Sequence, residues 1–413
     1  MEDIIMTEKN LIPLLRFPKF VRDAEWISTT LRAEMDYENG VAHENDIDSL
    51  GKYIVVNSKF ISTEGQIEKR SNNAHCLAEE NDILMVLSDL PNGKAIAKCF
   101  YVDASNKYTV NQRICKLRSK GANSKLLYYL LNRNPYFLSF DDGVKQTNLK
   151  KDEVLSCPLI IPKSIEEQQK IAECLSSIDS YISSINKKVE QLKAHKTSLL
   201  QKLFPQNGKN VPEYRFPEFK KDSTWKKMKL GDVTTVINRR NKSSRSLPIY
   251  SISNKDGFVL QSEQFDGLDS ESRGYDISLY KIVGRNTFAY NPARINIGSI
   301  GYSGNLKEVL ISSLYVCFKT TDELDDEFLQ CFLKTAEFNQ AVENNVEGGI
   351  RSYLFYENFS RINISIPSLQ EQKKIASTIL SIDDVISKYT DKVSLLEDYK
   401  KGLMQQLFPA ITK

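Results

Sequence analysis

Residues 167–205 read EQQKIAECLSSIDSYISSINKKVEQLKAHKTSLLQKLFP, and this stretch decides the fold because the chain repeats it. Residues 371–409 read EQKKIASTILSIDDVISKYTDKVSLLEDYKKGLMQQLFP, which aligns with the first copy without a gap. The offset is 204 residues, and about half of the aligned positions are identical. So long a period indicates two similar halves, each a globular segment followed by this stretch.

Both copies place apolar residues in alternating steps of four and three, which is the heptad pattern of a coiled coil. We expect two helices of about 37 residues, each roughly 55 Å long, that pair with each other and end at Pro205 and Pro409. The predicted seams are Ile171, Leu175, Ile178, Ile182, Ile185, Val189, Leu192, Lys196, Leu199 and Leu203, and Ile375, Ile379, Ile382, Ile386, Tyr389, Val393, Leu396, Lys400, Leu403 and Leu407.

The one charged position of each seam is a lysine at an a position, Lys196 in the first copy and Lys400 in the second. A single polar residue at such a position lowers stability but helps to set the register and the oligomeric state. The alternative is a lysine in solvent at a point where the two helices diverge. The pattern leaves both interpretations open.

The composition is that of an ordinary soluble protein, with 41% hydrophobic and 26% charged residues in 413. This length allows two to three domains, and the net charge of +3 does not by itself indicate a nucleic-acid-binding protein. Seven scattered cysteines without a CxxC pair, and only three histidines, make a zinc site unexpected and fit reduced thiols. No stretch resembles a signal peptide or a membrane span, so we expect a soluble cytoplasmic protein.

A second repeat stands at the entrance to each half. Residues 13–26 and 212–225 share the frame Pro-x-x-Arg-Phe-Pro-x-Phe-x-x-Asp-x-x-Trp, which contains both tryptophans of the chain. Two prolines and several aromatic residues in so short a span favour an extended segment packed on a domain surface. We call these two stretches the entrance segments and predict a structural role for them.

Each half also carries a mixed α/β segment. We predict strands at 53–56, 82–87 and 159–162 in the first half, and at 248–252, 287–290, 309–311 and 364–367 in the second. We predict helices at 125–131 and at 326–333, the latter continuing to about residue 342. Landmarks recur at near-constant offset, with Gly143 matching Gly348 and Leu149 matching Leu354. One scaffold built twice, with different segments between the landmarks, predicts two different binding surfaces.

Motifs of catalysis are missing from the sequence. There is no GxxxxGK[ST], GxGxxG, GxSxG or HExxH, and His43, His75 and His195 are isolated along the chain. Asn291-Pro292 begins like an amino-methyltransferase motif, but Ala293 follows and no glycine-rich loop accompanies it. We therefore predict neither a catalytic nor a metal site in this chain.

Several loops instead carry residue types that read DNA bases. Arginine and lysine pair with the major-groove edge of guanine, and asparagine and glutamine with that of adenine. The same side chains also hold phosphates without sequence preference, or simply lie in solvent. The candidates are Lys69, Arg70, Asn72, Asn73, Lys145, Gln146, Thr147, Asn148, Arg239, Arg240, Asn241, Lys242, Arg245, Asn291, Arg294, Asn296, Arg351, Ser352 and Tyr353.

Nearly the whole chain resembles the specificity (S) subunits of type I restriction–modification systems. The resemblance is carried by the Glu-Gln-x-Lys-Ile-Ala starts at Glu167 and Glu371, the Leu-Phe-Pro ends at Leu203 and Leu407, and the Arg-Phe-Pro-x-Phe entrances. One departure is that Met228-Lys-Leu-Gly-Asp232, usual in the family after the tryptophan, has no match after Trp26.

The resemblance implies a non-catalytic DNA-recognition subunit with two target recognition domains. Its two long helices would pair antiparallel and hold the domains apart, as a ruler between the two parts of an asymmetric double-stranded DNA target. Two methylation subunits with AdoMet and two restriction subunits using ATP and Mg²⁺ would dock on it, and the chain itself would carry no cofactor.

The predicted fold is thus α+β with a pseudo-twofold internal repeat. The predicted limits are 1–165 for the first recognition domain, 166–205 for the central helix, 206–369 for the second domain and 370–413 for the last helix. Two alternatives remain at this point. One is a coiled-coil scaffold joining two protein-binding modules, which predicts no DNA affinity, and the other is an enzyme with a divergent site.

Overall fold

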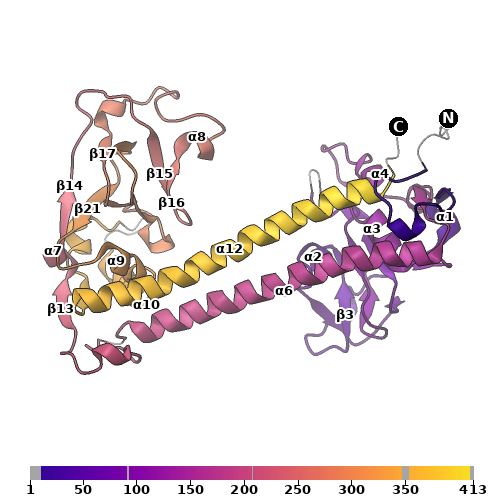
Figure 1. Ribbon diagram of the computed structural model, residues 1–413, viewed down its shortest axis with the longest axis horizontal. Coiled ribbons are helices and arrows are strands. Elements are labelled where there is room, and N and C mark those ends of the chain that lie inside the picture. Colours follow the sequence, from indigo (N-terminus) through magenta and orange to yellow (C-terminus); the bar gives the residue numbers. More distant parts are fainter. Residues whose placement is uncertain (1–10, 91–92, 207, 347–352, 410–413) are drawn as a thin grey trace. The chain divides into compact units, whose positions relative to one another are not determined.

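The computed structural model describes residues 11–90, 93–206, 208–346 and 353–409. The chain forms two compact units, unit 1 from Met1–Ile185 with Lys392–Lys413, and unit 2 from Asn186–Asp391. Two helices of 39 residues are shared between them. Helix α6 (Ile165–Leu203) begins in unit 1 and ends in unit 2, and α12 (Leu369–Leu407) begins in unit 2 and ends in unit 1 (Figure 1).

Unit 1 contains two four-stranded sheets and two strand pairs. One sheet has the order β2-β10-β6-β8 (Met35–Asn39, Ile114–Ser119, Ile83–Val86, Cys99–Tyr101), and the other the order β4-β3-β9-β5 (Lys69–Ser71, Tyr53–Val56, Tyr108–Val110, Leu77–Ala78). The pairs are β1-β12 (Ile27–Thr30, Pro158–Ile161) and β7-β11 (Ser88–Asp89, Thr147–Asn148). Strands β3 and β9 run parallel, whereas their other neighbours β4 and β5 are antiparallel to them.

Unit 2 repeats the topology of the two sheets. Its sheets have the orders β14-β21-β18-β19 (Thr234–Ile237, Val316–Thr320, Phe288–Tyr290, Ile300–Tyr302) and β16-β15-β20-β17 (Gly257–Leu260, Ile249–Ser253, Val309–Ile311, Lys281–Val283). Again the pair equivalent to β3-β9, β15-β20, is parallel, and β13-β22 (Lys226–Lys229, Asn363–Ile366) matches β1-β12. The predicted internal repeat is confirmed.

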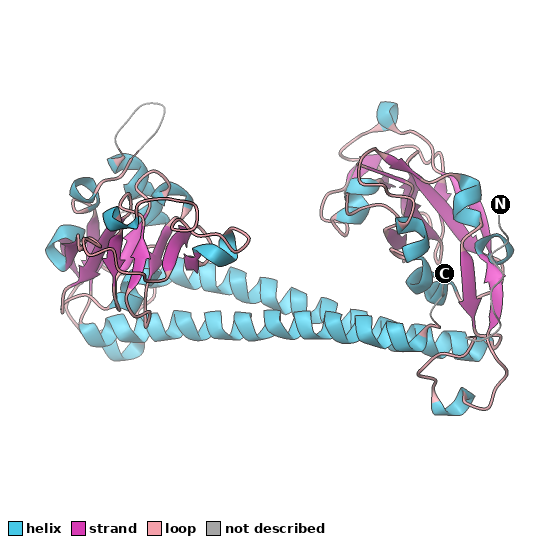
Figure 2. Ribbon diagram, turned by 90° about the horizontal axis from the view of Figure 1, so that it is seen from above, coloured by secondary structure: helices cyan, strands magenta, loops and turns pink. Residues whose placement is uncertain are grey.

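Short helices lie around the strands of each unit (Figure 2). Those of unit 1 are α1 (Leu31–Glu34), α2 (Ser58–Ser62), α3 (Ser124–Leu131), α4 (Pro135–Leu138), α5 (Lys151–Leu155), η1 (Pro18–Phe20) and η2 (Glu44–Asp46). Those of unit 2 are α7 (Leu230–Val233), α8 (Gln261–Gln264), α9 (Asp326–Phe332), α10 (Ala336–Asn345), α11 (Tyr356–Phe359), η3 (Pro217–Phe219), η4 (Ile277–Leu279) and η5 (Ile295–Ile297).

The predicted strands are all present, and one helix prediction was wrong. The segment predicted as a single helix from 326 to about 342 forms two helices, α9 and α10. The hydroxyl of Thr335 accepts a hydrogen bond from the backbone N–H of Phe338 (3.2 Å), so Thr335 caps the start of α10. A threonine in this position satisfies an N–H that the first turn leaves unpaired, which favours a new helix over continuation of the old one.

The helix seam follows the heptad prediction. None of its twenty residues is exposed, and Ile171, Leu175, Ile375 and Ile379 are fully buried. Within unit 1, Lys400 near the end of α12 forms an ion pair with Asp179 near the start of α6. Within unit 2, Lys196 near the end of α6 pairs with Asp383 near the start of α12, with Nζ 2.6 Å from Oδ2. The helices therefore pair antiparallel, and both seam lysines are held by carboxylates.

The entrance segments fasten the two helix ends within each unit. In unit 1 the Arg16 guanidinium donates to both carboxylate oxygens of Glu167 at 2.7 and 2.8 Å, and Trp26 Nε1 donates to the same carboxylate at 3.3 Å. The Leu15 N–H donates to the Gln406 carbonyl of α12 at 2.9 Å. The hydrogen bonds to Glu167 raise the pKa of Arg16 above its ordinary value.

Unit 2 repeats the arrangement. Arg215 donates to Glu371 at 2.9 and 2.7 Å, Trp225 Nε1 donates to it at 3.3 Å, and the Tyr214 N–H donates to the Lys202 carbonyl at 2.9 Å. We call each set of contacts a clasp. The predicted structural role of the entrance segments is confirmed.

Each unit has a core that includes both helices. In unit 1, Trp26, Leu126, Ile171 and Leu407 belong to one cluster of buried residues. In unit 2, Trp225, Phe328, Ile375 and Leu203 take the equivalent places. The last turn of each long helix is therefore part of a globular core and not only of the helix pair.

Candidate nucleic-acid interface

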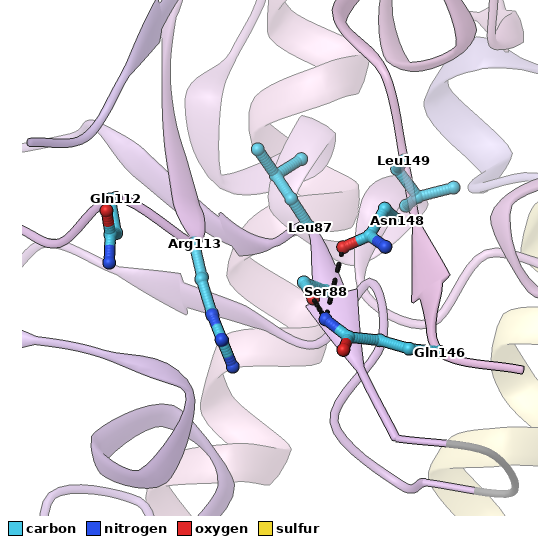
Figure 3. Close-up of a pocket in the computed structure, with 7 residues that line it drawn as sticks. All are labelled: Leu87, Ser88, Gln112, Arg113, Gln146, Asn148 and Leu149. Atoms are coloured by element: carbon cyan, nitrogen blue, oxygen red, sulfur yellow. Dashed lines mark hydrogen bonds between the residues drawn. The ribbon is translucent and has the colours of Figure 1, made fainter.

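Unit 1 contains a pocket of about 430 Å³ lined by Leu87, Ser88, Gln112, Arg113, Gln146, Asn148 and Leu149 (Figure 3). Three chain segments meet there, and the backbone of Leu87 joins them. The Leu87 N–H donates to the Arg113 carbonyl at 2.9 Å, and the Leu149 N–H donates to the Leu87 carbonyl at 2.8 Å. Strands β7 and β11 continue this junction, with Ser88 opposite Asn148.

The amide side chains of the pocket form a small hydrogen-bonded network. Gln146 Nε2 donates to Ser88 Oγ at 2.6 Å and lies 3.4 Å from Asn148 Oδ1 (Figure 3). Gln146 and Asn148 are exposed, whereas Thr147 between them is buried and its hydroxyl donates to Asp141 at 2.9 Å. The strand alternation therefore points the two amides to solvent and the threonine inward.

No carboxylate among the described residues neutralises the arginine of the pocket. Arg113 is exposed, and its guanidinium has no partner among the residues that the structure describes. The Asp89 carboxylate accepts instead from the backbone N–H groups of Leu90, Ala95 and Ile96.

The loop that leads into β11 is closed by a second aspartate. Asp142 accepts hydrogen bonds from the backbone N–H groups of Val144 and Lys145, at 2.9 and 3.1 Å. These bonds favour the charged carboxylate and lower the pKa of Asp142. The Lys145 side chain is exposed and has no partner in the described part of the chain.

The predicted cluster at Lys69–Asn73 is largely engaged within unit 1. Arg70 forms an ion pair with Glu68 at 2.9 Å. The Nδ2 atoms of Asn72 and Asn73 donate to Asp48 at 2.7 Å and to Asp46 at 2.8 Å, respectively. Lys69 is exposed and has no side-chain partner in the described ranges, so its charge is available for a contact with DNA, as the prediction assumed.

In unit 2 the Arg239–Arg245 loop is partly neutralised by one glutamate. Arg245 binds Glu308 at 2.7 Å and Arg239 binds its other oxygen, and these two contacts lower the pKa of Glu308. Arg240 and Lys242 are exposed, and neither has a side-chain partner among the described residues.

Asn241 has a structural role that its neighbours in the sequence did not reveal. It is fully buried, its Oδ1 accepts from the Arg245 N–H at 2.9 Å, and its Nδ2 donates to the Arg245 carbonyl at 3.0 Å. These bonds close the loop and use both ends of the Asn241 amide, which argues against the predicted base contact by this residue.

The remaining candidates of unit 2 lie at the equivalent of the unit 1 pocket. The Leu354 N–H donates to the Pro292 carbonyl at 3.0 Å, as Leu149 does to Leu87. Asn291 Oδ1 accepts from the Ala293 N–H at 3.0 Å, whereas Arg294 and Asn296 are exposed. Tyr353 stacks on Phe355 with ring centroids 5.7 Å apart. Arg351 and Ser352 lie outside the described residues.

Three lining residues of the pocket, Ser88, Gln112 and Arg113, were missed by sequence reasoning. The available signal was positional, because Ser88 directly follows the predicted strand 82–87 and Arg113 directly precedes β10. Residues at strand ends lie at sheet edges, but nothing in the sequence says which ends meet.

The cysteine thiols are mostly buried. Burial raises the pKa of the Cys76 thiol to about 11 and that of Cys157 to about 12, which keeps both protonated. His43 and His75, isolated along the chain, are neighbours in the fold, with rings 5.1 Å apart. Within the described ranges no cluster of three or more metal-ligating side chains occurs, and no helix suits a membrane span.

Comparison with known proteins identifies the family. The family described as "Type I restriction modification DNA specificity domain" matches residues 36–194 and 222–395, once in each half and over most of the chain. The type I restriction enzyme MjaVIII specificity subunit of Methanocaldococcus jannaschii is 25% identical over 356 residues, which are 81% of this chain and 80% of that protein.

Two solved structures show the same fold. The S subunit of a type I restriction–modification system from M. genitalium matches with a TM-score of 0.62 at 17% identity, over 97% of this chain and 100% of that one. A chain from a study of complex assembly and conformational transition of the type I system matches with a TM-score of 0.50 at 14% identity, over 92% and 96%. The chain therefore belongs to the family of type I restriction–modification specificity subunits.

Proposed function

We propose that this chain is the non-catalytic DNA-recognition subunit of a type I restriction–modification complex and that each unit reads one part of a bipartite target. The observation that carries the proposal is the repeated junction, where Leu149 bonds to Leu87 in unit 1 and Leu354 bonds to Pro292 in unit 2. The backbone bond is the same in both places and the side chains differ. Two similar frames with different polar groups address two different half-sites, which makes the target asymmetric.

Exposed cations support contact with the DNA backbone. Six of these cations have no side-chain partner within the described ranges: Lys69, Arg113 and Lys145 in unit 1, and Arg240, Lys242 and Arg294 in unit 2. Such groups bind phosphates with little sequence preference and orient the protein on the duplex. The small net charge of +3 is sufficient if the partner subunits supply much of the phosphate contact.

The antiparallel helices are proposed to set the spacing between the two half-sites and to dock the partner subunits. The partners are two methylation subunits, which bind AdoMet, and two restriction subunits, which use ATP and Mg²⁺. The specificity chain itself carries no cofactor and works in the cytoplasm. Support for an assembly comes from the relatives, which are described as specificity subunits and as parts of a type I system.

The test uses the specificity chain purified together with its methylation subunit. We expect a sequence-selective gel shift and methylation of one bipartite, asymmetric motif in sequenced host DNA. Arg294→Ala should change the preference in one half-site only, because Arg294 belongs to unit 2. A complex that assembles but binds all DNA equally, or none, would favour the scaffold alternative and reject the proposal.

A further inference from the structure

We propose that the unit 1 pocket is a base-reading subsite in which Arg113 reads a guanine and the Gln146–Asn148 pair reads an adjacent adenine in the major groove. This inference rests on the proposed function and deepens it by assigning bases to side chains. It follows from the hydrogen-bonding capacity that the pocket leaves unused.

The amide pair is arranged to offer one donor and one acceptor. Gln146 Nε2 is used by Ser88 Oγ and faces Asn148 Oδ1, so Gln146 Oε1 and Asn148 Nδ2 have no partner among the described residues. If both amides are turned over, the unused atoms become Gln146 Nε2 and Asn148 Oδ1, again one donor and one acceptor. Adenine presents the complement, an N6 donor next to an N7 acceptor. Guanine presents two acceptors there and does not match.

Arg113 supplies the second specificity. Its guanidinium carries five N–H donors in a fixed fork, which fits the O6 and N7 acceptors of guanine. It is exposed and unpaired in the described part of the chain, and the neighbouring Asp89 is already occupied by three backbone N–H groups. The Leu87 N–H donates to the Arg113 carbonyl at 2.9 Å, and Ser88, the next residue, is paired with Asn148. Arg113 and the amide pair therefore lie on hydrogen-bonded neighbouring segments.

The equivalent positions of unit 2 carry different side chains. In the turn before β10, the Ile114 N–H donates to the Asn111 carbonyl at 2.9 Å. The equivalent turn of unit 2 is closed in the same way, because the Tyr315 N–H donates to the Ser312 carbonyl at 3.2 Å. Leu314 therefore takes the place of Arg113, and it is 78% exposed.

The serine of the network and one amide of the pair are also replaced in unit 2. Pro292 is equivalent to Leu87, so Ala293, the next residue, takes the place of Ser88. Leu354 is equivalent to Leu149, so Tyr353, the residue before it, takes the place of Asn148. The apolar side chains of Ala293 and Leu314 suit the methyl group of thymine rather than polar base edges. The subsite therefore discriminates between the two halves of the target.

The test measures methylation of a library with randomised half-sites by the complex with the methylation subunit. Arg113→Ala is expected to reduce the guanine preference at one position of one half-site by roughly 5- to 140-fold. Asn148→Asp replaces the donor by an acceptor and should shift the neighbouring preference from adenine towards cytosine, whose N4 is a donor. Arg22→Ala, an exposed arginine of the entrance segment, is the matched control and should leave the motif unchanged.

The outcomes separate the two proposals. An unchanged motif in Arg113→Ala, or an equal loss at every sequence as a phosphate contact would give, overturns the subsite while the wild-type motif upholds the proposed function. A wild-type complex without sequence preference overturns both. If Arg113→Ala does not fold, Arg113→Gln keeps a long polar side chain but carries an amide, which pairs with adenine, and a retained guanine preference in that variant overturns the assignment.

Discussion

Breaking the clasp of unit 1 should destabilise that unit alone. Glu167→Ala leaves the Arg16 guanidinium without its carboxylate at a site where the two side chains are only 7% and 2% exposed. Arg16 keeps its bonds to the carbonyls of Asp23 (3.1 Å) and Ala24 (3.0 Å), which do not neutralise its charge. Removing one partner of a buried ion pair costs about 3–5 kcal/mol. With a urea m value of about 3 kcal/mol per molar, the unfolding midpoint should fall by roughly 1–2 M.

The chain provides its own reporters, because each clasp holds one of the two tryptophans. Urea unfolding followed by fluorescence in a Trp225→Phe background reports on Trp26 and unit 1. The matched variant Glu371→Ala, followed through Trp225 in a Trp26→Phe background, should show the same loss in unit 2. The double variant Arg16→Met, Glu167→Ala should be more stable than Glu167→Ala, since no unpaired charge remains.

Two results would refute this reasoning. One is a loss below about 1 kcal/mol in Glu167→Ala, which is the range of an exposed pair. The other is a double variant no more stable than the single one, which would mean that the cost lies in lost packing and not in an unpaired charge.

Three further predictions concern the helices and the histidine pair. A double-mutant cycle of Lys400→Met with Asp179→Asn should give a coupling of about 0.5–1 kcal/mol in urea unfolding, because both side chains are partly exposed (22% and 38%); zero coupling would contradict the pairing. Burial lowers the pKa of His43 below 6.5, so the unfolded chain takes up a proton that the folded chain refuses, and the free energy of unfolding should fall as the pH drops below 6.5. His43→Gln should flatten that part of the pH–stability curve, and an unchanged slope would argue against it. Inserting one heptad into each helix adds about 10 Å, or roughly three base pairs, and should lengthen the spacer of the methylated motif without changing either half-site; an unchanged spacer refutes the ruler.

The sequence predicted the helix pair well because its signal is local and periodic. All twenty seam residues are sheltered, as the heptads require. The role of Lys196 and Lys400 stayed open, since their partners Asp383 and Asp179 lie outside the seam and 187 and 221 residues away in sequence. The predicted domain limits follow the order of the chain and stay a prediction, whereas the compact units divide both helices.

The candidate site was harder to predict because it is assembled from strand ends. Gln146 and Asn148 were predicted from their residue type, and their place after the glycine that both halves share supported the prediction. Arg113 was not found, because its position beside Ser88 depends on the pairing of β10 with β6 and not on any motif. The burial of Asn241 likewise depends on its hydrogen bonds to the Arg245 backbone, which residue type alone does not reveal.

The shared helices also impose an order on synthesis. The core of unit 1 includes Leu407, so its first 185 residues leave the ribosome without the segment that completes them. Unit 2 needs only residues up to Asp391, and can close before unit 1 does. Translation at about 5–20 residues per second separates the end of α6 from the end of α12 by roughly 10–40 s. Unit 1 is therefore synthesised first but completed last. During that interval the apolar surface that α12 will cover is exposed and needs protection from other partners.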